Sequence, residues 1–226
     1  MAISDWTAEH DNKLREMLHD GLHARPLIQN EMESFVLQLT SRITYHATFH
    51  QRPSKEIHRI KNKVRRYREQ NSSLSIDQAL EKIGDMEGGR IILTHLEEVY
   101  RVYGLFCEYV KRSPGLHLKG QPDDHNKKDP NTSDDTGYRG LHQVVEIRLY
   151  GDRWFPFEVQ FHTGIQAVWA DIDHVIYENY SKLNLSPGIR DRMKSIAETL
   201  HESTLMLQEV EGEVQNLLVK APTPGP

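Results

Sequence analysis

Cysteine is almost absent from this sequence: Cys107 is the only one among 226 residues, so no internal disulfide can form. No apolar run is long enough to cross a bilayer, and the first residues lack the basic segment and apolar run of a signal peptide. We therefore expect a cytoplasmic protein that makes no membrane contact. Positive charge is also in short supply, because 33 acidic side chains outnumber 28 lysines and arginines. The resulting net charge of -5 argues against a general nucleic-acid-binding surface.

Against this acidic background, one short segment concentrates positive charge. Its lysines and arginines, all within ten residues, are Arg59, Lys61, Lys63, Arg65, Arg66 and Arg68. A basic helix face exposed to solvent is one explanation for such a run. A clamp for a polyphosphate is the other, because arginine offers a planar fork that matches phosphate oxygens and lysine adds a mobile charge. Charge alone does not separate these two interpretations.

Hydrophobic spacing predicts a chain that mixes helices and strands. Two helices are expected within residues 5–50, separated at Pro26, because proline is common near a helix start. The further predicted elements are a short helix over 76–83 capped by Ser75, a buried strand that follows Asp85, a core helix over 96–110, a hairpin of strands 141–150 and 154–162, and helices over 163–180 and 189–218. Residues 113–136 are long and polar, which is typical of a functional or disordered loop.

Acidic side chains stand where strands can present them to a ligand. Asp85 precedes the predicted strand that ends at Leu93. It is either an ordinary turn residue or a ligand of a hard cation such as magnesium, which prefers carboxylate oxygen. In the second strand of the hairpin, the alternation puts Glu158, Gln160 and His162 on one face and apolar residues on the other. That polar face is therefore either exposed to solvent or part of a site.

A glycine-rich turn precedes the hairpin, and a partly polar helix follows it. The turn and the first strand begin with Gly137, Tyr138, Arg139, Gly140, Leu141 and His142. On the helix, Gln166, Asp173, His174 and Tyr177 approach one another at spacings of three, four and seven residues. A lone histidine such as His174 is more often structural than catalytic. Even so, a tight turn with an aromatic ring and a cation, followed by a strand with a carboxylate and a helix, is the layout of a nucleotide site.

Taken in order, these motifs resemble those of the RelA/SpoT-type alarmone synthetases, in particular the small single-domain members that lack a hydrolase domain. The resemblance runs from about Pro53 to Val214. Its carriers are Arg59-Ile60-Lys61, Asp85 with Gly88 and Arg90-Ile91-Ile92, the turn from Gly137 to His142, the strand from Glu158 to Thr163, and the helix from Ala167 to Tyr180. Several ordered motifs at compatible spacings are far more specific than any one of them.

The resemblance implies an α+β fold, a mixed β-sheet flanked by helices and akin to nucleotidyltransferases. It divides the chain into N-terminal helices at 1–50, a catalytic core at 51–182, a C-terminal helix for oligomerisation at 183–220 and a disordered tail at 221–226. It implies an ATP-dependent pyrophosphokinase, which moves the β,γ-diphosphate of ATP to the 3′-hydroxyl of GDP or GTP and yields ppGpp or pppGpp and AMP. Small members are often homotetramers, and the long final helix fits a homo-oligomer of this kind.

The resemblance also implies roles for single residues. Asp85 and Glu158 would hold Mg²⁺, and Glu158, with Gln160 beside it, could also deprotonate the attacking hydroxyl. The ATP-binding residues would be Arg59, Lys61, Lys63, Arg65, Arg66 and Arg90. The acceptor nucleotide would be bound by Tyr138, stacked on the base, and by Arg139, His142 and His174. These residue types suit phosphoryl transfer, which depends chiefly on in-line positioning and charge neutralisation.

Some positions depart from the family pattern and leave the acceptor open. His162 stands where the family has an arginine, and Asp134 and Asp135 precede Gly137 in place of the usual lysine-containing segment. One alternative is a toxic relative that modifies adenosine nucleotides or the 3′ end of transfer RNA and is neutralised by an antitoxin partner. The acidic charge balance argues mildly against an RNA substrate. Another alternative is a nucleotide-binding regulator that has lost catalysis, but binding alone would not require both carboxylates.

Overall fold

One five-stranded mixed sheet forms the centre of the molecule, with the strand order β1-β2-β5-β4-β3. The computed structural model describes residues 5–42, 46–127, 137–172 and 187–220. Its strands are β1 (Thr48–Gln51), β2 (Glu87–Leu93), β3 (Leu116–Asp124), β4 (Leu141–Arg148) and β5 (Trp154–Thr163). Strands β2 and β5 pair in parallel, and the other three neighbouring pairs are antiparallel. The hairpin of β4 and β5 is confirmed as predicted.

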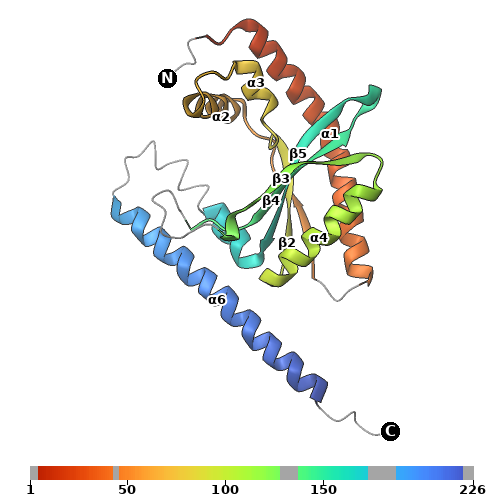
Figure 1. Ribbon diagram of the computed structural model, residues 1–226, viewed down its shortest axis with the longest axis vertical. Coiled ribbons are helices and arrows are strands. Elements are labelled where there is room, and N and C mark those ends of the chain that lie inside the picture. Colours follow the sequence, from red (N-terminus) through yellow and green to blue (C-terminus); the bar gives the residue numbers. More distant parts are fainter. Residues whose placement is uncertain (1–4, 43–45, 128–136, 173–186, 221–226) are drawn as a thin grey trace.

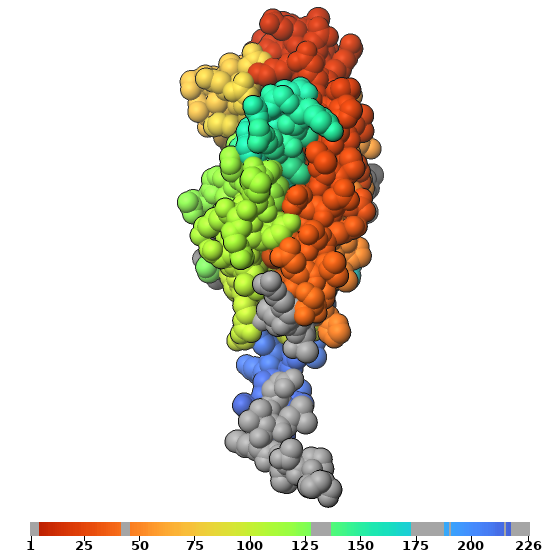
Figure 2. All heavy atoms as spheres, turned by 90° about the vertical axis from the view of Figure 1, so that its right-hand side faces the viewer, coloured from red at the N-terminus to blue at the C-terminus, as the bar shows by residue number. Residues whose placement is uncertain are grey.

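Helices surround the sheet and connect its strands. They are α1 (Ala8–Arg42), α2 (Ile57–Gln70), α3 (Ile76–Glu81), α4 (Leu96–Arg112), a helix at 164–172 and α6 (Pro187–Lys220), with 3₁₀ turns at His125–Lys127 and Tyr150–Asp152. Helices α1 and α4 cover one face of the sheet and lie side by side (Figures 1 and 2). Helix α6 is on the other side and extends past the rest of the molecule (Figure 1). Among the described helices, none is long and apolar enough to span a membrane.

The main core lies between the sheet and the α1–α4 layer. The ring of Phe106 on α4 meets those of Phe161 on β5 and Phe35 on α1 at centroid distances of 5.3 and 5.2 Å. Phe157 and Phe161 of β5 are fully buried, as is Val159 between them. Because side chains alternate along a strand, the residues between these three face the other side of the sheet. The alternation predicted for this strand is confirmed, and it turns the polar face of β5 away from the main core.

Residues 8–42 form one continuous helix, so the prediction of two helices separated at Pro26 is wrong. Pro26 lies inside α1. Buried apolar residues recur every three or four positions from just before it to the end of the helix, at Ala24, Ile28, Met32, Phe35 and Leu39, and Leu14 is buried nearer the start. Burial of this continuous stripe outweighs the roughly 3 kcal/mol that an interior proline costs a helix.

Two strands lie where the sequence predicts none. The segment 113–136, predicted to be a loop, contains β3. Strand β1 begins at Thr48, inside the segment 5–50 that was predicted to be helical. Both are edge strands, so each pairs with a neighbour on one side alone. Their polar side chains obscure the apolar alternation by which a strand is recognised in a sequence. The register of β3 also shifts between Lys119 and Asp123. By contrast, the predicted cap of α3 is confirmed, since the backbone N–H of Gln78 donates to Ser75 Oγ at 3.1 Å.

Candidate functional site

Glu158 lies on the polar face of the central strand β5, between β2 and β4. Arg52 Nη1 is 2.9 Å from its Oε2, Gln160 Nε2 donates to the same oxygen at 2.6 Å, and His142 Nδ1 is 3.4 Å from Oε1. Burial alone would raise the pKa of Glu158, but the hydrogen bond and charge of His142 and the charge of Arg52 outweigh it and hold the pKa well below its usual range. The carboxylate is therefore ionised at neutral pH.

Asp85 lies just before β2, where two lysines hold it. Lys63 Nζ, from α2, is 2.7 Å from Oδ2, and Lys55 Nζ contacts the same oxygen. Burial alone would raise the pKa of Asp85, but the charges of Lys63 and Lys55 lower it. The other oxygen, Oδ1, is buried and has no hydrogen-bond partner among the described residues. Such an oxygen offers a coordination position to a cation.

The two carboxylates fit the predicted magnesium site. They lie close enough for the charge of Glu158 to raise the pKa of Asp85, in opposition to the lysines. Over the ranges that the structure describes, no group of three or more acidic, histidine or cysteine side chains is placed to hold a metal ion. Mg²⁺ usually takes one or two carboxylates and completes its shell with water and substrate phosphates. The residues present therefore suit a magnesium ion that binds together with a nucleotide.

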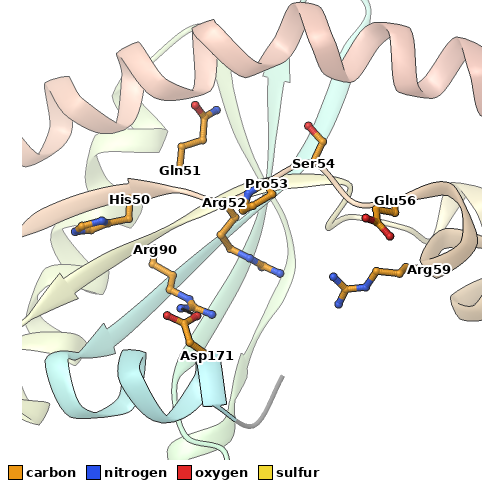
Figure 3. A pocket seen from close by; sticks show the side chains of 9 residues that line it. All are labelled: His50, Gln51, Arg52, Pro53, Ser54, Glu56, Arg59, Arg90 and Asp171. Atoms are coloured by element: carbon orange, nitrogen blue, oxygen red, sulfur yellow. Dashed lines mark hydrogen bonds and ion pairs between the residues drawn. The ribbon is translucent and has the colours of Figure 1, made fainter. Parts of the chain in front are cut away.

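An open pocket of about 460 Å³ is lined in part by Arg52, Arg59 and Arg90, and Arg52 connects it to Glu158. In Figure 3, Arg52 and Arg59 extend toward each other from the two sides, and Arg90 faces Asp171. Arg90 Nη1 is 2.5 Å from Asp171 Oδ1, while its Nε donates to Gln160 Oε1 at 3.1 Å. Three guanidinium groups around one hollow can bind a polyanion. Because Gln160 also donates to Glu158, it links the pocket to the carboxylate.

One face of α2 directs part of the basic run toward this pocket. Arg59, Lys63 and Arg66 follow at spacings of four and three residues, so they share one side of the helix. Arg59 lines the pocket, Lys63 holds the buried aspartate and Arg66 is exposed. Ile60 and Val64 are fully buried and fix the orientation of the helix.

Lys61 and Arg65 lie on the opposite side of α2. Lys61 Nζ is 2.8 Å from Asp11 Oδ1 and 4.6 Å from the ring centroid of Trp6. Arg65 Nη2 donates to Asn62 Oδ1 at 3.0 Å. The structure thus brings Arg59, with Arg90 of β2, to the pocket, and it places Lys61 and Arg65 elsewhere.

Tyr138 lies among histidines beside the polar face of β5. Its hydroxyl is 2.7 Å from His142 Nε2 and 3.1 Å from His162 Nε2. Its ring meets that of His125 edge-on, with 5.2 Å between centroids. Since His142 also contacts Glu158, two of the predicted acceptor residues, Tyr138 and His142, come together with the carboxylate.

Arg139 takes a different direction from its neighbour Tyr138. It is buried, donates through Nη1 to the carbonyl oxygen of Tyr138 at 2.9 Å, and lines a small hollow beneath α6 together with Ala197 and His201. It therefore lies between the glycine turn and α6, and it does not line the pocket of Arg52, Arg59 and Arg90. His174, the remaining predicted acceptor residue, lies outside the described residues.

Two cations of the site, Arg52 and Lys55, are absent from the sequence-based prediction. They pair with carboxylates that are 106 and 30 positions away in the chain. No spacing rule connects residues so far apart, and the segment that carries them has no regular period. The available signal is their charge, because both directly precede the basic run and lengthen it.

Comparison with solved structures places the fold in a known class. The crystal structure of small alarmone synthetase 1 from Bacillus subtilis matches with a TM-score of 0.71 and 20% identity, over 91% of this chain and 99% of that chain. The same synthetase bound to its product pppGpp matches with a TM-score of 0.61 and 22% identity, over 74% and 79% of the two chains. The predicted fold, a mixed sheet flanked by helices as in small alarmone synthetases, is confirmed.

Sequence comparison identifies the family. A family model described as the region found in RelA / SpoT proteins matches residues 52–182, which is more than half of the chain. The chain therefore belongs to the RelA/SpoT family. GTP pyrophosphokinase YwaC of Bacillus subtilis (strain 168) is 25% identical over 150 residues. That match covers 65% of this chain and 65% of YwaC, slightly less than two thirds of the length of this relative.

Proposed function

We propose that this protein is an ATP-dependent pyrophosphokinase that converts GDP or GTP to ppGpp or pppGpp. The observation that carries the proposal is a pair of neighbouring carboxylates, Asp85 and Glu158, beside a cationic pocket. Arg52 pairs with Glu158 and lines this pocket together with Arg59 and Arg90. A triphosphate needs cations around it, and the metal that accompanies it needs carboxylates. One site that offers both suits a nucleoside triphosphate as the donor substrate.

In the proposed reaction, the arginines bind the triphosphate of ATP. The 3′-oxygen of the acceptor forms a bond to the β-phosphorus, the bond from that phosphorus to the oxygen bridging to the α-phosphorus breaks, and AMP leaves with that oxygen. The proton of the hydroxyl passes to Glu158. The low pKa of Glu158 makes it a weak proton acceptor. Most of the acceleration must then come from in-line positioning and neutralisation of phosphate charge.

Asp85 and Glu158 would hold the Mg²⁺, which neutralises charge on the phosphate oxygens when it is bound. Lys55 and Lys63 keep Asp85 in place through Oδ2 and leave Oδ1 for the cation. Gln160 keeps the carboxylate of Glu158 oriented through the hydrogen bond that it donates.

A guanosine nucleotide is the proposed acceptor. Support comes from the two relatives, because small alarmone synthetase 1 was solved with its product pppGpp and YwaC is a GTP pyrophosphokinase. In this chain, Tyr138 and His142 would contact the acceptor, since they are the predicted acceptor residues that lie beside Glu158. An aromatic ring suits the face of a nucleobase.

We further propose that the protein is a homo-oligomer, with a tetramer as the expected form. Helix α6 exposes Met206, Val210, Val214 and Leu217, each by nearly half or more of its surface. Their spacings of four, four and three residues align them in one stripe. A second copy of the chain would cover this stripe.

The proposed function is tested by AMP formation from ATP and Mg²⁺, with and without GDP or GTP. We expect AMP release that requires the guanosine nucleotide and is matched by an equal amount of ppGpp or pppGpp. Release that requires deacylated transfer RNA or an adenosine acceptor would instead indicate a toxic relative. Tight nucleotide binding without any AMP would indicate a regulator.

A further inference from the structure

His162, on the polar face of β5, is enclosed within the site. It is fully buried on β5, and its Nε2 is 3.1 Å from the hydroxyl of Tyr138. Its ring stacks on that of His142, with 5.8 Å between centroids and 28° between planes. A Cβ added at Gly140 would lie 2.3 Å from His162 Nε2, so the glycine turn leaves just enough room for this ring.

The surroundings of His162 keep its imidazole neutral. Burial, and then the positive charges of His142, Arg90 and Arg52, hold the pKa of His162 well below its usual value. A neutral imidazole has one N–H group. Nδ1 is buried and has no hydrogen-bond partner among the described residues, whereas Nε2 faces the hydroxyl of Tyr138. The single N–H therefore belongs at Nε2, where it has an acceptor.

His162, Tyr138, His142 and Glu158 form one continuous chain of contacts. His142 Nδ1 faces a carboxylate oxygen of Glu158, which accepts only, so this nitrogen carries a proton. The hydroxyl of Tyr138 lies between the two rings, 2.7 Å from His142 Nε2 and 3.1 Å from His162 Nε2. The contacts therefore run without a break from His162 to Tyr138, to His142 and to Glu158. The tyrosine hydroxyl is thus held from both sides.

We propose that His162 is a positioning residue for the acceptor nucleotide: through the hydroxyl of Tyr138 it fixes the ring that contacts the acceptor, and through His142 it ties that ring to Glu158. The inference rests on the proposed function, because it takes Tyr138 as an acceptor-binding residue. An arginine at this buried position would add a third positive charge beside Arg52 and Arg90. A neutral histidine supplies the hydrogen bond without that charge.

Two conservative variants separate the hydrogen bond from the mere presence of a polar side chain. The amide nitrogen of glutamine can reach the position of Nε2, so His162→Gln keeps the donor to Tyr138. Asparagine is shorter and reaches the position of Nδ1, so His162→Asn loses that donor while it stays polar. Tyr138→Phe removes the hydroxyl and keeps the ring. Tyr109→Phe is the matched control, because its hydroxyl donates to Glu31 Oε2 at 2.6 Å, in the layer of α1 and α4.

The measurement is the Kd of GDP with Mg²⁺ and no ATP, alongside the Kd of α,β-methylene-ATP. We expect His162→Asn and Tyr138→Phe each to weaken GDP binding by about tenfold, the value of one hydrogen bond, with ATP-analogue binding unchanged. The double variant should bind GDP no more weakly than Tyr138→Phe alone, and His162→Gln should stay within about threefold of the unmodified protein. The inference would be overturned if His162→Asn bound GDP with the affinity of the unmodified protein, or if it lost equal affinity for GDP and for the ATP analogue. Additive losses of GDP affinity in the double variant would also overturn it.

A ligand-independent measurement separates failure of this inference from failure of the proposed function. The ¹⁵N resonances of the histidine rings report which nitrogen carries a proton. We expect His162 to be protonated at Nε2 alone, and Tyr138→Phe to shift that resonance and the Nε2 resonance of His142. If the unmodified protein does not bind GDP, the guanosine acceptor is refuted and these resonances still decide the geometry. A His162 ring that does not respond to Tyr138→Phe would overturn the inference whatever the acceptor.

Discussion

At the scale of single residues, the surroundings of Glu158 fix its orientation and keep it charged, and they make it a weaker base. Arg52, Gln160 and His142 surround it, and together they keep the carboxylate ionised. Substitution by glutamine keeps the shape and removes the charge. We therefore expect Glu158→Gln to lower AMP formation by at least about 10²-fold while the protein stays folded.

The matched control for this change is Glu146→Gln. Glu146 lies on β4 and pairs at 2.9 Å with Lys119, near the edge of the sheet. This variant should keep the AMP formation rate of the unmodified protein. Undiminished turnover in Glu158→Gln, with circular dichroism showing a folded protein in both, would refute the role assigned to Glu158.

The depressed pKa values of Asp85 and Glu158 also predict how stability depends on pH. A carboxylate whose pKa is lower in the folded state stabilises the protein fully above the unfolded-state pKa near 4, and this contribution is lost as pH falls through the folded-state value. The free energy of unfolding should therefore fall as the pH drops from about 5 to about 3. Urea unfolding at a series of pH values measures this free energy, and its decrease with falling pH should be shallower in Glu158→Gln. The same pH dependence in the unmodified protein and in Glu158→Gln would contradict the lowered pKa of Glu158.

Some site residues could be predicted from the sequence, and others could not. Asp85 and Glu158 were accessible because they stand at recognisable places beside strands. Arg52 could not be predicted, because its role depends on a contact across 106 positions. Lys61 shows the converse, since charge and motif favour a phosphate contact, yet its side chain pairs with Asp11 on α1.

At the scale of elements, the glycine turn before β4 packs against α6. Gly137 has a φ of 76°, a conformation that residues other than glycine adopt at a cost. A Cβ at this position would also lie 2.1 Å from Cβ of Ala197 on α6. Helix α6 can therefore sit against the turn that carries Tyr138 only if position 137 has no side chain.

We expect Gly137→Ala to lower the free energy of unfolding by about 1–3 kcal/mol, from backbone strain and overpacking together. Urea denaturation of Gly137→Ala, Ala197→Gly and the double variant tests this cause. Removal of the Ala197 methyl group relieves the clash, so the double variant should be more stable than the sum of the two single changes predicts. Strictly additive effects would contradict a direct contact between the turn and α6.

The helices and strands differ in how well the sequence predicts them. The amphipathic spacing of α4 and the alternation of β5 define these elements because each has one apolar face against the core. The edge strands β1 and β3 give no such pattern, since water meets much of their surface. For α1, the apolar spacing continued through Pro26 and was the better guide than the proline itself.

At the scale of the whole molecule, α6 extends past the rest of the fold (Figure 1), and it exposes the apolar stripe of Met206, Val210, Val214 and Leu217. If a second copy covers it, a charge placed in its centre must be buried and will oppose association. We expect Val210→Glu to lower the mass measured by light scattering, whereas Asn216→Glu, exposed on α6 but off the stripe, should leave it unchanged. A monomeric unmodified protein, or equal masses in both variants, would contradict the proposed oligomer.

The most direct test of the central claim follows the label of γ-labelled ATP in the presence of Mg²⁺. GDP, GTP, ATP and deacylated transfer RNA are offered as acceptors in separate reactions. A pyrophosphokinase of guanosine nucleotides should move the label to the 3′ position of GDP or GTP and release unlabelled AMP in equal amount. Label on RNA or on an adenosine nucleotide alone, or no transfer to any acceptor, would contradict the account.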